Sequence, residues 1–299
     1  MKIAILTGTH RKNSAYKTMN ALNSRGQVTC ELVHYDDVMI TIDENQESCT
    51  FYHDAEPRDI DEFDLIYIHG AGGEELRPLV ASVAEIKGIP FLNSENLNTQ
   101  YICKASQYLK FKRAGLPIPR TIVGYPSVLR KAFETEAPGA WIIKLAAGSN
   151  GKDNFLINAE NDIDSCDNKS LYVMQPFIAN DFDYWIIVGG DKVLLAYKRS
   201  RDKSRTHVNN VHQGGTREFT GNPLPKRIES IAIKASNAVN REISGVDILI
   251  SADNKPYLLE SNFNYGLPKI EDIPASYFDS LQEYLIAYAK DGHRPQKGA

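Results

Sequence analysis

Cysteine is scarce in this chain, and long apolar runs are missing. The four cysteines, at positions 30, 49, 103 and 166, show no CxxC or other metal-ligand spacing. Such a pattern indicates free structural thiols rather than a disulfide or zinc framework. No run of 18 apolar residues occurs, and the apolar start Ile3–Leu6 gives way to polar residues too soon for a signal-peptide core. We therefore expect a cytoplasmic protein that does not cross a membrane.

Neither sign of charge is in large excess. The 34 Lys and Arg residues against 38 Asp and Glu give a formal net charge of −4 and a pI near 6.0. This mild acidity argues against binding nucleic acid or an anionic membrane through bulk charge, and it favours a small-molecule or protein partner. The P-loop and GxGxxG patterns of two common nucleotide-binding folds are also missing. At 299 residues, the chain is long enough for about two domains.

The first ninety residues alternate strand and helix signals, which predicts a small, mainly parallel α/β domain. The signals lie, in order, at residues 3–6 (strand), 14–23 (helix), 28–34 (strand), 65–68 (strand) and 74–87 (helix). Residues 44–61 are polar and aperiodic, so we expect a long surface loop there. The pattern changes near Asn93, and we place the domain boundary there, between residues 1–92 and 93–299.

The second part begins with a helix and continues with short strands. A helical stretch at 99–114 ends at Gly115 and is followed by Pro117 and Pro119, which stop a helix. Further on, the patterns predict strands near 140–145, 154–157, 172–175, 184–188 and 192–198, a helix near 226–240, a hairpin near 246–261 and a last helix near 276–289.

Two acidic residues fall opposite each other in the predicted hairpin. If Asp253-Asn254 is a two-residue turn, Asp247 pairs with Glu260, and Asn262 shares the face of Glu260. Carboxylates about 4–5 Å apart repel by roughly 1–4 kcal/mol at effective dielectric constants of 80 to 20, so a cation between them is favoured. Three oxygen-bearing side chains suit a Mg²⁺ ion that also holds phosphates. The alternatives are a solvated hairpin face or two carboxylates that share a proton.

A lysine interrupts the apolar strand near 140–145. Lys144 is followed by a loop that contains Gly148, Ser149 and Gly151. A lysine buried without an anion loses its charge or costs several kcal/mol, but next to accessible backbone N–H groups it can hold a phosphate. The alternative is a lysine on an edge strand whose ammonium group extends to water.

Taken together and in order, these segments resemble the ATP-grasp carboxylate–amine ligases of the RimK type, with glutathione-synthetase-like enzymes as relatives. The resemblance covers roughly residues 90–270. It implies an α/β (α+β) chain with an ATP-grasp fold, whose central lid spans about 118–175 and whose C-terminal lobe spans about 176–292. It also implies that residues 1–92 form an N-terminal, Rossmann-like pre-ATP-grasp domain.

The resemblance gives roles to individual residues. Those implied to contact the nucleotide are Lys104, Lys144, Gly148, Ser149, Gly151, Gln175, Phe177, Ile178, Asp183 and Asn210. Among these, the two lysines match phosphate-binding positions, and Gln175, Phe177 and Ile178 match the hinge that reads adenine through backbone groups. The residues that match the magnesium ligands of the family are Asp247, Glu260 and Asn262. Arg199 matches the basic strand end that faces the transferred phosphate, so Arg199 and Lys144 are the catalytic candidates.

Three positions depart from the family pattern. Pro176 stands where the family hinge has Glu, Trp185 replaces an arginine, and Val208 replaces another. Cations that could compensate are Lys198, Arg201, Lys203 and Arg205. Trp141 and Trp185 are expected in the core, and His207 and His212 in solvent.

The segment Gly8–Ser14 is similar to the phosphate-binding loop of flavodoxin-like FMN reductases. A loop of this composition after a strand can hold an anion at the N-terminus of the next helix. Within the resembled ligases it would help bind a substrate, and the candidates are Thr9, Arg11, Lys12, Asn13 and Ser14. The alternative is a plain strand–helix connection.

The resemblance implies an ATP- and Mg²⁺-dependent ligase, with Mn²⁺ as a second metal. A carboxylate attacks the γ-phosphate to give an acyl phosphate and ADP, and an amine then displaces phosphate to form an amide. The implied substrates are amino acids or peptides, and a protein acceptor and a homo-oligomer remain open. Two alternatives are an ATP-grasp small-molecule kinase and a nucleotide-binding regulatory protein without turnover. The opposed acids of the hairpin argue against the regulatory protein, which gains nothing from them.

Overall fold

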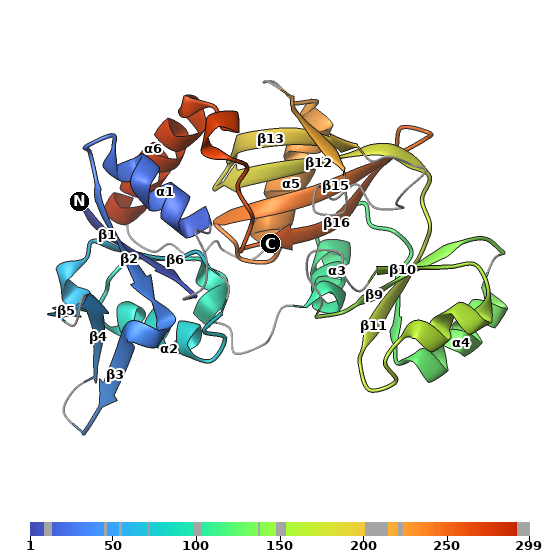
Figure 1. Ribbon diagram of the computed structural model, residues 1–299, viewed down its shortest axis with the longest axis horizontal. Coiled ribbons are helices and arrows are strands. Elements are labelled where there is room, and N and C mark those ends of the chain that lie inside the picture. Colours follow the sequence, from blue (N-terminus) through green and yellow to red (C-terminus); the bar gives the residue numbers. More distant parts are fainter. Residues whose placement is uncertain are drawn as a thin grey trace.

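A computed structural model describes most of the chain, namely residues 1–8, 14–44, 47–53, 56–70, 72–97, 103–136, 138–147, 154–200, 215–220 and 224–291. The strands within these residues form four sheets. In Figure 1 the largest sheet lies at the top, between an N-terminal sheet on the left and a smaller sheet on the right. No helix among these residues has the length and apolar character needed to cross a membrane.

The N-terminal sheet is parallel, with strand order β2-β1-β6-β7. Its elements are β1 (Lys2–Thr7), α1 (Ser14–Asn23), β2 (Thr29–His34), β6 (Leu65–Ile68), α2 (Leu76–Ile86) and β7 (Phe91–Leu92). Alternate residues of β1 enter two cores: Ile3 and Ile5 face α1 and the C-terminal helix α6 (Ala275–Asp291), whereas Ala4 and Leu6 face α2. Burial on both faces explains the continuous apolar runs that predict these strands.

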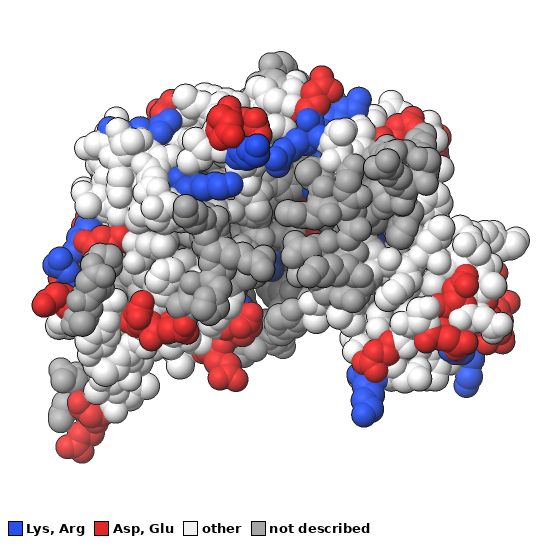
Figure 2. All heavy atoms as spheres, in the orientation of Figure 1, with Lys and Arg blue, Asp and Glu red and all other residues white. Residues whose placement is uncertain are grey.

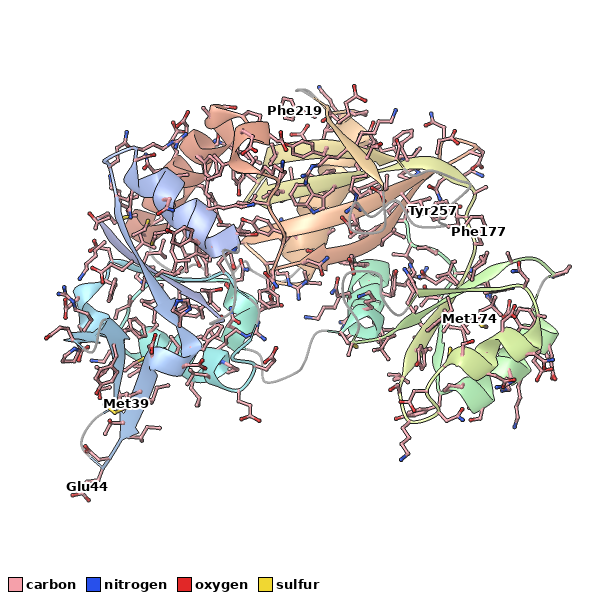
Figure 3. All side chains as sticks on the ribbon, in the orientation of Figure 1. Met39, Glu44, Met174, Phe177, Phe219 and Tyr257 are labelled. Atoms are coloured by element: carbon pink, nitrogen blue, oxygen red, sulfur yellow. The ribbon has the colours of Figure 1, made fainter. Side chains whose placement is uncertain are left out.

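The predicted loop at 44–61 is wrong. This region holds most of an antiparallel sheet of β3 (Val38–Ile42), β4 (Glu47–His53) and β5 (Glu56–Asp59). Of the β4 residues whose burial is described, 47–52, Cys49 and Phe51 are the fully buried ones, so the strand carries too little apolar pattern to be recognised. The sheet extends away from the rest of the chain, with Met39 and Glu44 labelled towards its outer end (Figure 3) and acidic side chains gathered there in Figure 2.

The small sheet is antiparallel, with strand order β10-β9-β11-β8. It is preceded by α3 (Lys104–Arg113) and is built from β8 (Ile122–Gly124), α4 (Pro126–Thr135), β9 (Trp141–Leu145), β10 (Asn154–Ile157) and β11 (Tyr172–Pro176). Trp141 is 3% exposed and packs with Leu129 of α4, which confirms its expected place in a core. The predicted helix at 99–114 is seen as α3, since residues 98–102 lie outside the described part.

The largest sheet is antiparallel, with strand order β14-β13-β12-β15-β16. The strands are β12 (Asn180–Gly189), β13 (Lys192–Ser200), β14 (Thr216–Phe219), β15 (Ile243–Ser251) and β16 (Pro256–Asn262). The helix α5 (Lys226–Ala238) covers one face through an apolar core that includes Val246 and Ile248. Part of the other face packs against α6 and the N-terminal sheet through Ile187 and Ile243.

Short 3₁₀ helices connect several elements: η1 (Tyr35–Asp37), η2 (Ile60–Glu62), η3 (Ser94–Leu97), η4 (Glu160–Ser165) and η6 (Ile270–Asp272). The segment around η3 is joined to the start of β15 by a buried group of side chains. We call Ser94, Glu95, Arg241 and Glu242 the junction cluster. Arg241 forms an ion pair of 2.8 Å with Glu95, and the Ser94 amide donates to Glu242 over 2.7 Å. Burial raises the pKa of Glu242.

Candidate functional site

The charged residues singled out by the sequence meet on the face of the largest sheet that α5 does not cover. On β15, the side chains of Val246 and Ile248 belong to the core under α5, so Asp247 between them faces the other way. Asp247 lies opposite Glu260 of β16, as predicted. Both carboxylates are therefore on one face of the sheet.

The predicted turn of this hairpin is wrong, although the pairing is right. The Ser251 amide donates to the Lys255 carbonyl over 2.9 Å, so three residues, Ala252, Asp253 and Asn254, form the loop. Asn254 has φ of +61°, a left-handed conformation that Asn adopts more readily than most residues. A three-residue loop with a left-handed third residue is a common hairpin connection.

A bulge at Leu259 restores the predicted pairing. Ile248 pairs with Leu258 and Asp247 pairs with Glu260, so Leu259 is an extra residue on β16. Without the bulge, the register of the turn would place Glu260 opposite Val246, in the core under α5. Bulges re-aim side chains in this way beside functional sites. The bulge thus moves Glu260 onto the face of Asp247.

Glu260 is surrounded by donors from α3 and β9. Its carboxylate is 3.2 Å from the Lys104 Nζ at the start of α3. Burial raises the pKa of Glu260, but Lys104, a hydrogen bond from Asn262 and the charge of Lys144 outweigh it and hold the pKa below its usual value. One turn after Lys104, the Gln107 side chain accepts from the Ser261 amide over 2.9 Å, which fixes α3 against this edge strand.

Asp247 is held by an arginine from the next strands. Arg199 of β13 lies 3.2 Å from the Asp247 carboxylate, and its Nε donates to Asp183 of β12 over 2.7 Å. Burial, Glu260 and Asp183 together raise the pKa of Asp247 to about 7, although Arg199 opposes this. The pKa of Arg199 is raised, because these two carboxylates outweigh its burial.

Lys144 approaches the carboxylates from the small sheet. Its strand β9 lies between β10 and β11, so it is not an edge strand and the alternative of an edge lysine is excluded. Its Nζ donates to the Gln175 Oε1 over 3.2 Å, and the Tyr108 hydroxyl donates to the same atom over 3.4 Å. Burial lowers the pKa of Lys144 to about 8, although Glu260 counteracts it. The side chains of Lys144 and Gln175 therefore form one fixed unit.

We call Lys104, Lys144, Asp183, Arg199, Asp247 and Glu260 the site cluster. It holds three cations and three carboxylates, and each opposed carboxylate already contacts a cation. The repulsion that predicted a metal is thus offset within the protein. If nucleotide phosphates bound Lys104 and Arg199, these cations would leave Glu260 and Asp247. The two carboxylates would then be available to bind a divalent cation.

The donor set of the hairpin fits Mg²⁺ or Mn²⁺ that is shared with phosphates. Asp247, Glu260 and Asn262 offer only oxygen ligands, which hard cations prefer. Among the described residues no group of three or more His, Cys, Asp or Glu is arranged so that it could hold a metal ion, so these side chains alone do not complete an octahedral shell. Nucleotide oxygens and water would supply the remaining ligands, as is usual for Mg²⁺.

The hinge residues are engaged within the protein. Gln175 is buried and its Nε2 donates to Thr121 over 2.9 Å. The Phe177 amide donates to the Ala140 carbonyl over 2.8 Å, and the Ile178 carbonyl accepts from Asn180 over 2.8 Å. Phe177 lies where the chain passes from the small to the largest sheet (Figure 3).

Lys198 and Trp185, two further residues considered from the sequence, add no charge to the cluster. Lys198 stacks on Phe182 at 4.2 Å, on the face towards α5, so it does not replace a missing cation beside Arg199. Trp185 pairs with Asp247 across the sheet, and it packs against the apolar core through contacts that include the Tyr197 ring at 5.9 Å. This agrees with the core role expected for Trp185.

Several predicted residues lie outside the described part of the chain: Gly148, Ser149, Gly151 and Asn210, Thr9 to Asn13, and Arg201, Lys203, Arg205, His207, Val208 and His212. Ser14, the last residue of the predicted anion loop, is described. Its hydroxyl donates to the Tyr265 carbonyl and accepts from the Leu267 amide, each over 2.9 Å. Ser14 thereby ties α1 to the loop that follows β16.

Sequence reasoning missed Gln107 and Tyr108. Both follow Lys104 at spacings of three and four residues, which places them on the same side of α3. This spacing could have indicated that Gln107 and Tyr108 lie near the site. Their partners Ser261 and Gln175 could not be predicted, because they are more than 60 residues away along the chain.

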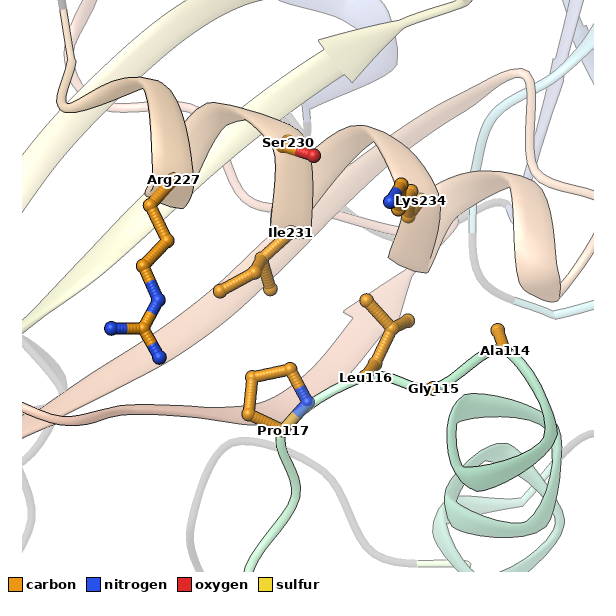
Figure 4. A pocket seen from close by; sticks show the side chains of 8 residues that line it. All are labelled: Ala114, Gly115, Leu116, Pro117, Arg227, Ser230, Ile231 and Lys234. Carbon is orange, nitrogen blue, oxygen red and sulfur yellow. The ribbon is translucent and has the colours of Figure 1, made fainter.

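A pocket of about 380 Å³ lies elsewhere, between the end of α3 and α5 (Figure 4). Its lining residues are Ala114, Gly115, Leu116, Pro117, Arg227, Ser230, Ile231 and Lys234. None of the predicted site residues lines it, and α5 covers the opposite face of the sheet from Asp247. The site is therefore defined by its charged side chains and not by this pocket.

Comparisons with known proteins show which family this chain resembles in sequence. Residues 104–277 match the model of the RimK-like ATP-grasp domain. A probable alpha-L-glutamate ligase of Cellvibrio japonicus is 26% identical over 305 residues, which cover 99% of this chain and 97% of that protein. A protein of the same name from Trichodesmium erythraeum is 30% identical over 186 residues, 58% of this chain and 61% of that one.

The fold is shared with solved ATP-grasp ligases. The ligase PsnB, complexed with a minimal precursor, Mg and ADP, has a TM-score of 0.70 at 17% identity and covers 96% of this chain and 97% of its own. D-alanyl-alanine synthetase A from Vibrio cholerae has a TM-score of 0.68 at 14% identity, and 98% of each chain is covered. The macrocyclase MdnC from Microcystis aeruginosa, bound to its precursor peptide, has a TM-score of 0.66 at 16% identity over 96% of this chain and all of its own.

Proposed function

The chain belongs to the RimK-like ATP-grasp family, and we propose that it joins a carboxylate to an amine with ATP, releasing ADP and phosphate. The observation that carries the proposal is the pair Asp247 and Glu260, which face each other beside cations from three different elements. Lysine and arginine side chains can bind nucleotide phosphates, and the opposed carboxylates can then bind the metal ion that accompanies the nucleotide.

Each residue of the cluster has a proposed task. Lys104, Lys144 and Arg199 orient the nucleotide phosphates and offset the charge that develops on the transferred phosphoryl group. Asp183 holds Arg199 in place through its 2.7 Å hydrogen bond. Asp247, Glu260 and Asn262 would hold Mg²⁺ or Mn²⁺, which adds positive charge at the same phosphates. No nucleophilic side chain is required, so positioning and electrostatics carry the reaction.

The substrates are proposed from the relatives. Two curated relatives are named glutamate ligases, and two solved neighbours hold precursor peptides, so we propose amino-acid or peptide substrates for this chain. We also propose the division into residues 1–92 and 93–299, because the parallel sheet ends at Leu92. The four cysteines are free, which supports a cytoplasmic location.

The test is to incubate the protein with ATP, Mg²⁺ and pooled amino acids and short peptides, and to measure ADP and new masses by LC–MS. We expect ADP together with a condensed mass that is one water lighter than its parts. A stable phosphorylated product without condensation would instead identify a kinase. ATP binding without ADP in any pool, including pools of protein acceptors, would identify a regulatory protein.

Glu260→Gln is the first prediction and the control for this assay. It removes a metal-binding charge at the reacting phosphates, so ADP formation should fall about 10²- to 10³-fold while circular dichroism stays unchanged. Glu62→Gln is the matched variant, because Glu62 also contacts a lysine at 3.2 Å but lies at the surface of the N-terminal part. It should keep full activity. Near-normal turnover in Glu260→Gln would refute the metal assignment.

A further inference from the structure

The inference concerns the sheet of β3, β4 and β5, whose first two strands we call the arm. The arm extends away from the rest of the chain in Figure 1. Ile42, the last residue of β3, is 73% exposed, the largest fraction among the large apolar side chains of the described part. Single exposed apolar side chains are common at protein surfaces, so the meaning of Ile42 depends on what surrounds it.

The surroundings of Ile42 are strongly acidic. Residues 26–57 contain eight Asp and Glu residues and no Lys or Arg, whereas the whole chain has a net charge of only −4. Asp43 and Glu44 directly follow Ile42, and Glu47 is the first residue of β4. Figure 2 shows acidic side chains at this end of the sheet. The outer end of the arm therefore presents one apolar side chain next to three acids.

The pocket of about 380 Å³ between α3 and α5 has the opposite character. Ile231 points towards Leu116 and Pro117, and Arg227 and Lys234 lie on either side of Ile231 (Figure 4). The two cations are seven residues apart on one helix, which is about 10 Å. Among the described residues, no acid lines the pocket. The pocket thus has an apolar part between two positive charges.

The cations of the pocket are available to a partner. Arg227 and Lys234 are exposed, and neither forms an ion pair with a residue that the structure describes. Lys112 and Arg113, in the last turn of α3, directly precede the pocket residue Ala114 and add to the positive charge there. Such a pocket favours a partner that brings an apolar side chain together with negative charge, which is the composition of the arm.

The arm and the pocket lie in different parts of the same chain. In Figure 1 the arm is at the lower left and points away from α3 and α5, so it can meet the pocket only in another molecule. The other use of the arm is to pair two β3 edge strands. A symmetric antiparallel pair centred on Ile40 would place Asp37 opposite Asp43 of the second copy, and like charges in these positions oppose it.

We propose that the outer end of the arm docks in the pocket of a second copy of this chain. Ile42 fills the apolar part of the pocket, and Asp43 and Glu44 meet its cations. The arm and the pocket are different surfaces, so the contacts either close into a ring or continue as an open chain. The inference concerns assembly and does not rest on the proposed ligase function.

Sedimentation velocity of the full chain tests the proposal at protein concentrations up to about 100 µM, where weak interfaces are populated. We expect the wild-type protein to form oligomers with masses that are multiples of 33.5 kDa, and added salt to dissociate them. The arm variant Asp43→Lys/Glu44→Lys and the pocket variant Arg227→Glu/Lys234→Glu should each be monomeric. Like charges then meet, so the dissociation constant should rise at least about 100-fold.

An equimolar mixture of the arm variant and the pocket variant provides the rescue. The reversed arm of one meets the reversed pocket of the other, and the unchanged arm meets the unchanged pocket, so association should return. Rescue would also show that neither variant is misfolded. Lys131→Glu/Lys169→Glu is the matched control, because it reverses two exposed lysines that do not line the pocket, and it should associate like the wild-type protein.

Three results would overturn the inference. The first is a wild-type protein that is monomeric throughout this concentration range. The second is a pocket variant that associates like the wild-type protein, because pairing of β3 strands or another surface would then join the copies. The third is a mixture of the two variants that stays monomeric.

Discussion

The junction cluster and the site cluster both bury charge beside β15 and β16, but they hold it differently. In the junction cluster, the Arg241 and Glu95 side chains are 3% and 8% exposed and 2.8 Å apart. In the site cluster, Lys104 and Glu260 are 19% and 22% exposed and 3.2 Å apart, and Arg199 and Asp247 are both 14% exposed at the same distance. The two pairs that hold the opposed acids are therefore longer and more exposed to water, whereas the Arg199–Asp183 pair of the site cluster, at 2.7 Å, is as short as the junction pair.

The lower exposure of the junction cluster indicates charges that stabilise the fold. The higher exposure of the pairs at Asp247 and Glu260 indicates charges that can exchange partners. Arg241 also donates to the Ser261 carbonyl, and Glu242 accepts from both the amide and the hydroxyl of Ser94. Breaking such a buried pair leaves an uncompensated charge, which costs several kcal/mol. The pairs of the opposed acids keep more access to water, so an incoming phosphate can replace their carboxylates more readily than it could in the junction cluster.

The largest effect is expected for Arg241→Met. This change leaves Glu95 buried without its cation, and the free energy of unfolding should fall by about 3–5 kcal/mol. Urea denaturation followed by fluorescence measures it. Arg120→Met is the control, because Arg120 is 64% exposed in its pair with Glu136, and it should change stability by less than about 1 kcal/mol. Equal losses in the two variants would contradict the role of the junction cluster.

A pH prediction follows from the buried His69, which contacts the rings of Tyr67 and Tyr265. Burial lowers the pKa of His69 to about 4, below its ordinary value of 6.5. The unfolded chain thus binds a proton that the folded chain excludes between these values. Stability is full above pH 6.5 and declines by about 3 kcal/mol as the pH falls to 4.

His69→Phe keeps the ring contacts and removes the titrating group. Its unfolding free energy should depend less on pH between 4 and 6.5 than that of the wild-type protein, as urea denaturation across this range measures. An identical pH slope in both proteins would show that His69 is not the titrating group.

The smallest effect on stability, but a clear effect on kinetics, is expected for Lys144→Ala. Because burial already lowers the pKa of Lys144 to about 8, the fold gains little from its charge. The KM for ATP should rise about 10-fold and kcat should fall, since a phosphate contact is lost. Lys255→Ala, at the exposed hairpin tip, is the matched control and should have wild-type kinetics. Unchanged kinetics in Lys144→Ala would exclude it from the site.

Many strands and the opposed acids could be predicted from local sequence pattern. The residues that contact these acids from other elements could not. The pairing of Asp247 with Glu260 was predicted from a two-residue turn, and it holds because the bulge at Leu259 offsets the three-residue turn that the structure has. The β4 strand was missed because only Cys49 and Phe51 reach the core, which leaves too little apolar periodicity. The contact of Lys104 with Glu260 joins residues far apart in sequence, and no local pattern encodes it.

The bulge at Leu259 has a consequence for how the hairpin tolerates change. A two-residue turn with an unbroken ladder and a three-residue turn with a bulge both place Asp247 opposite Glu260. The bulge lies between the turn and the Asp247–Glu260 pair, so it can compensate for a turn that is one residue longer or shorter. The loop at residues 252–254 can therefore be exchanged while Asp247 stays paired with Glu260. This makes the hairpin turn a suitable place for a tag or a label.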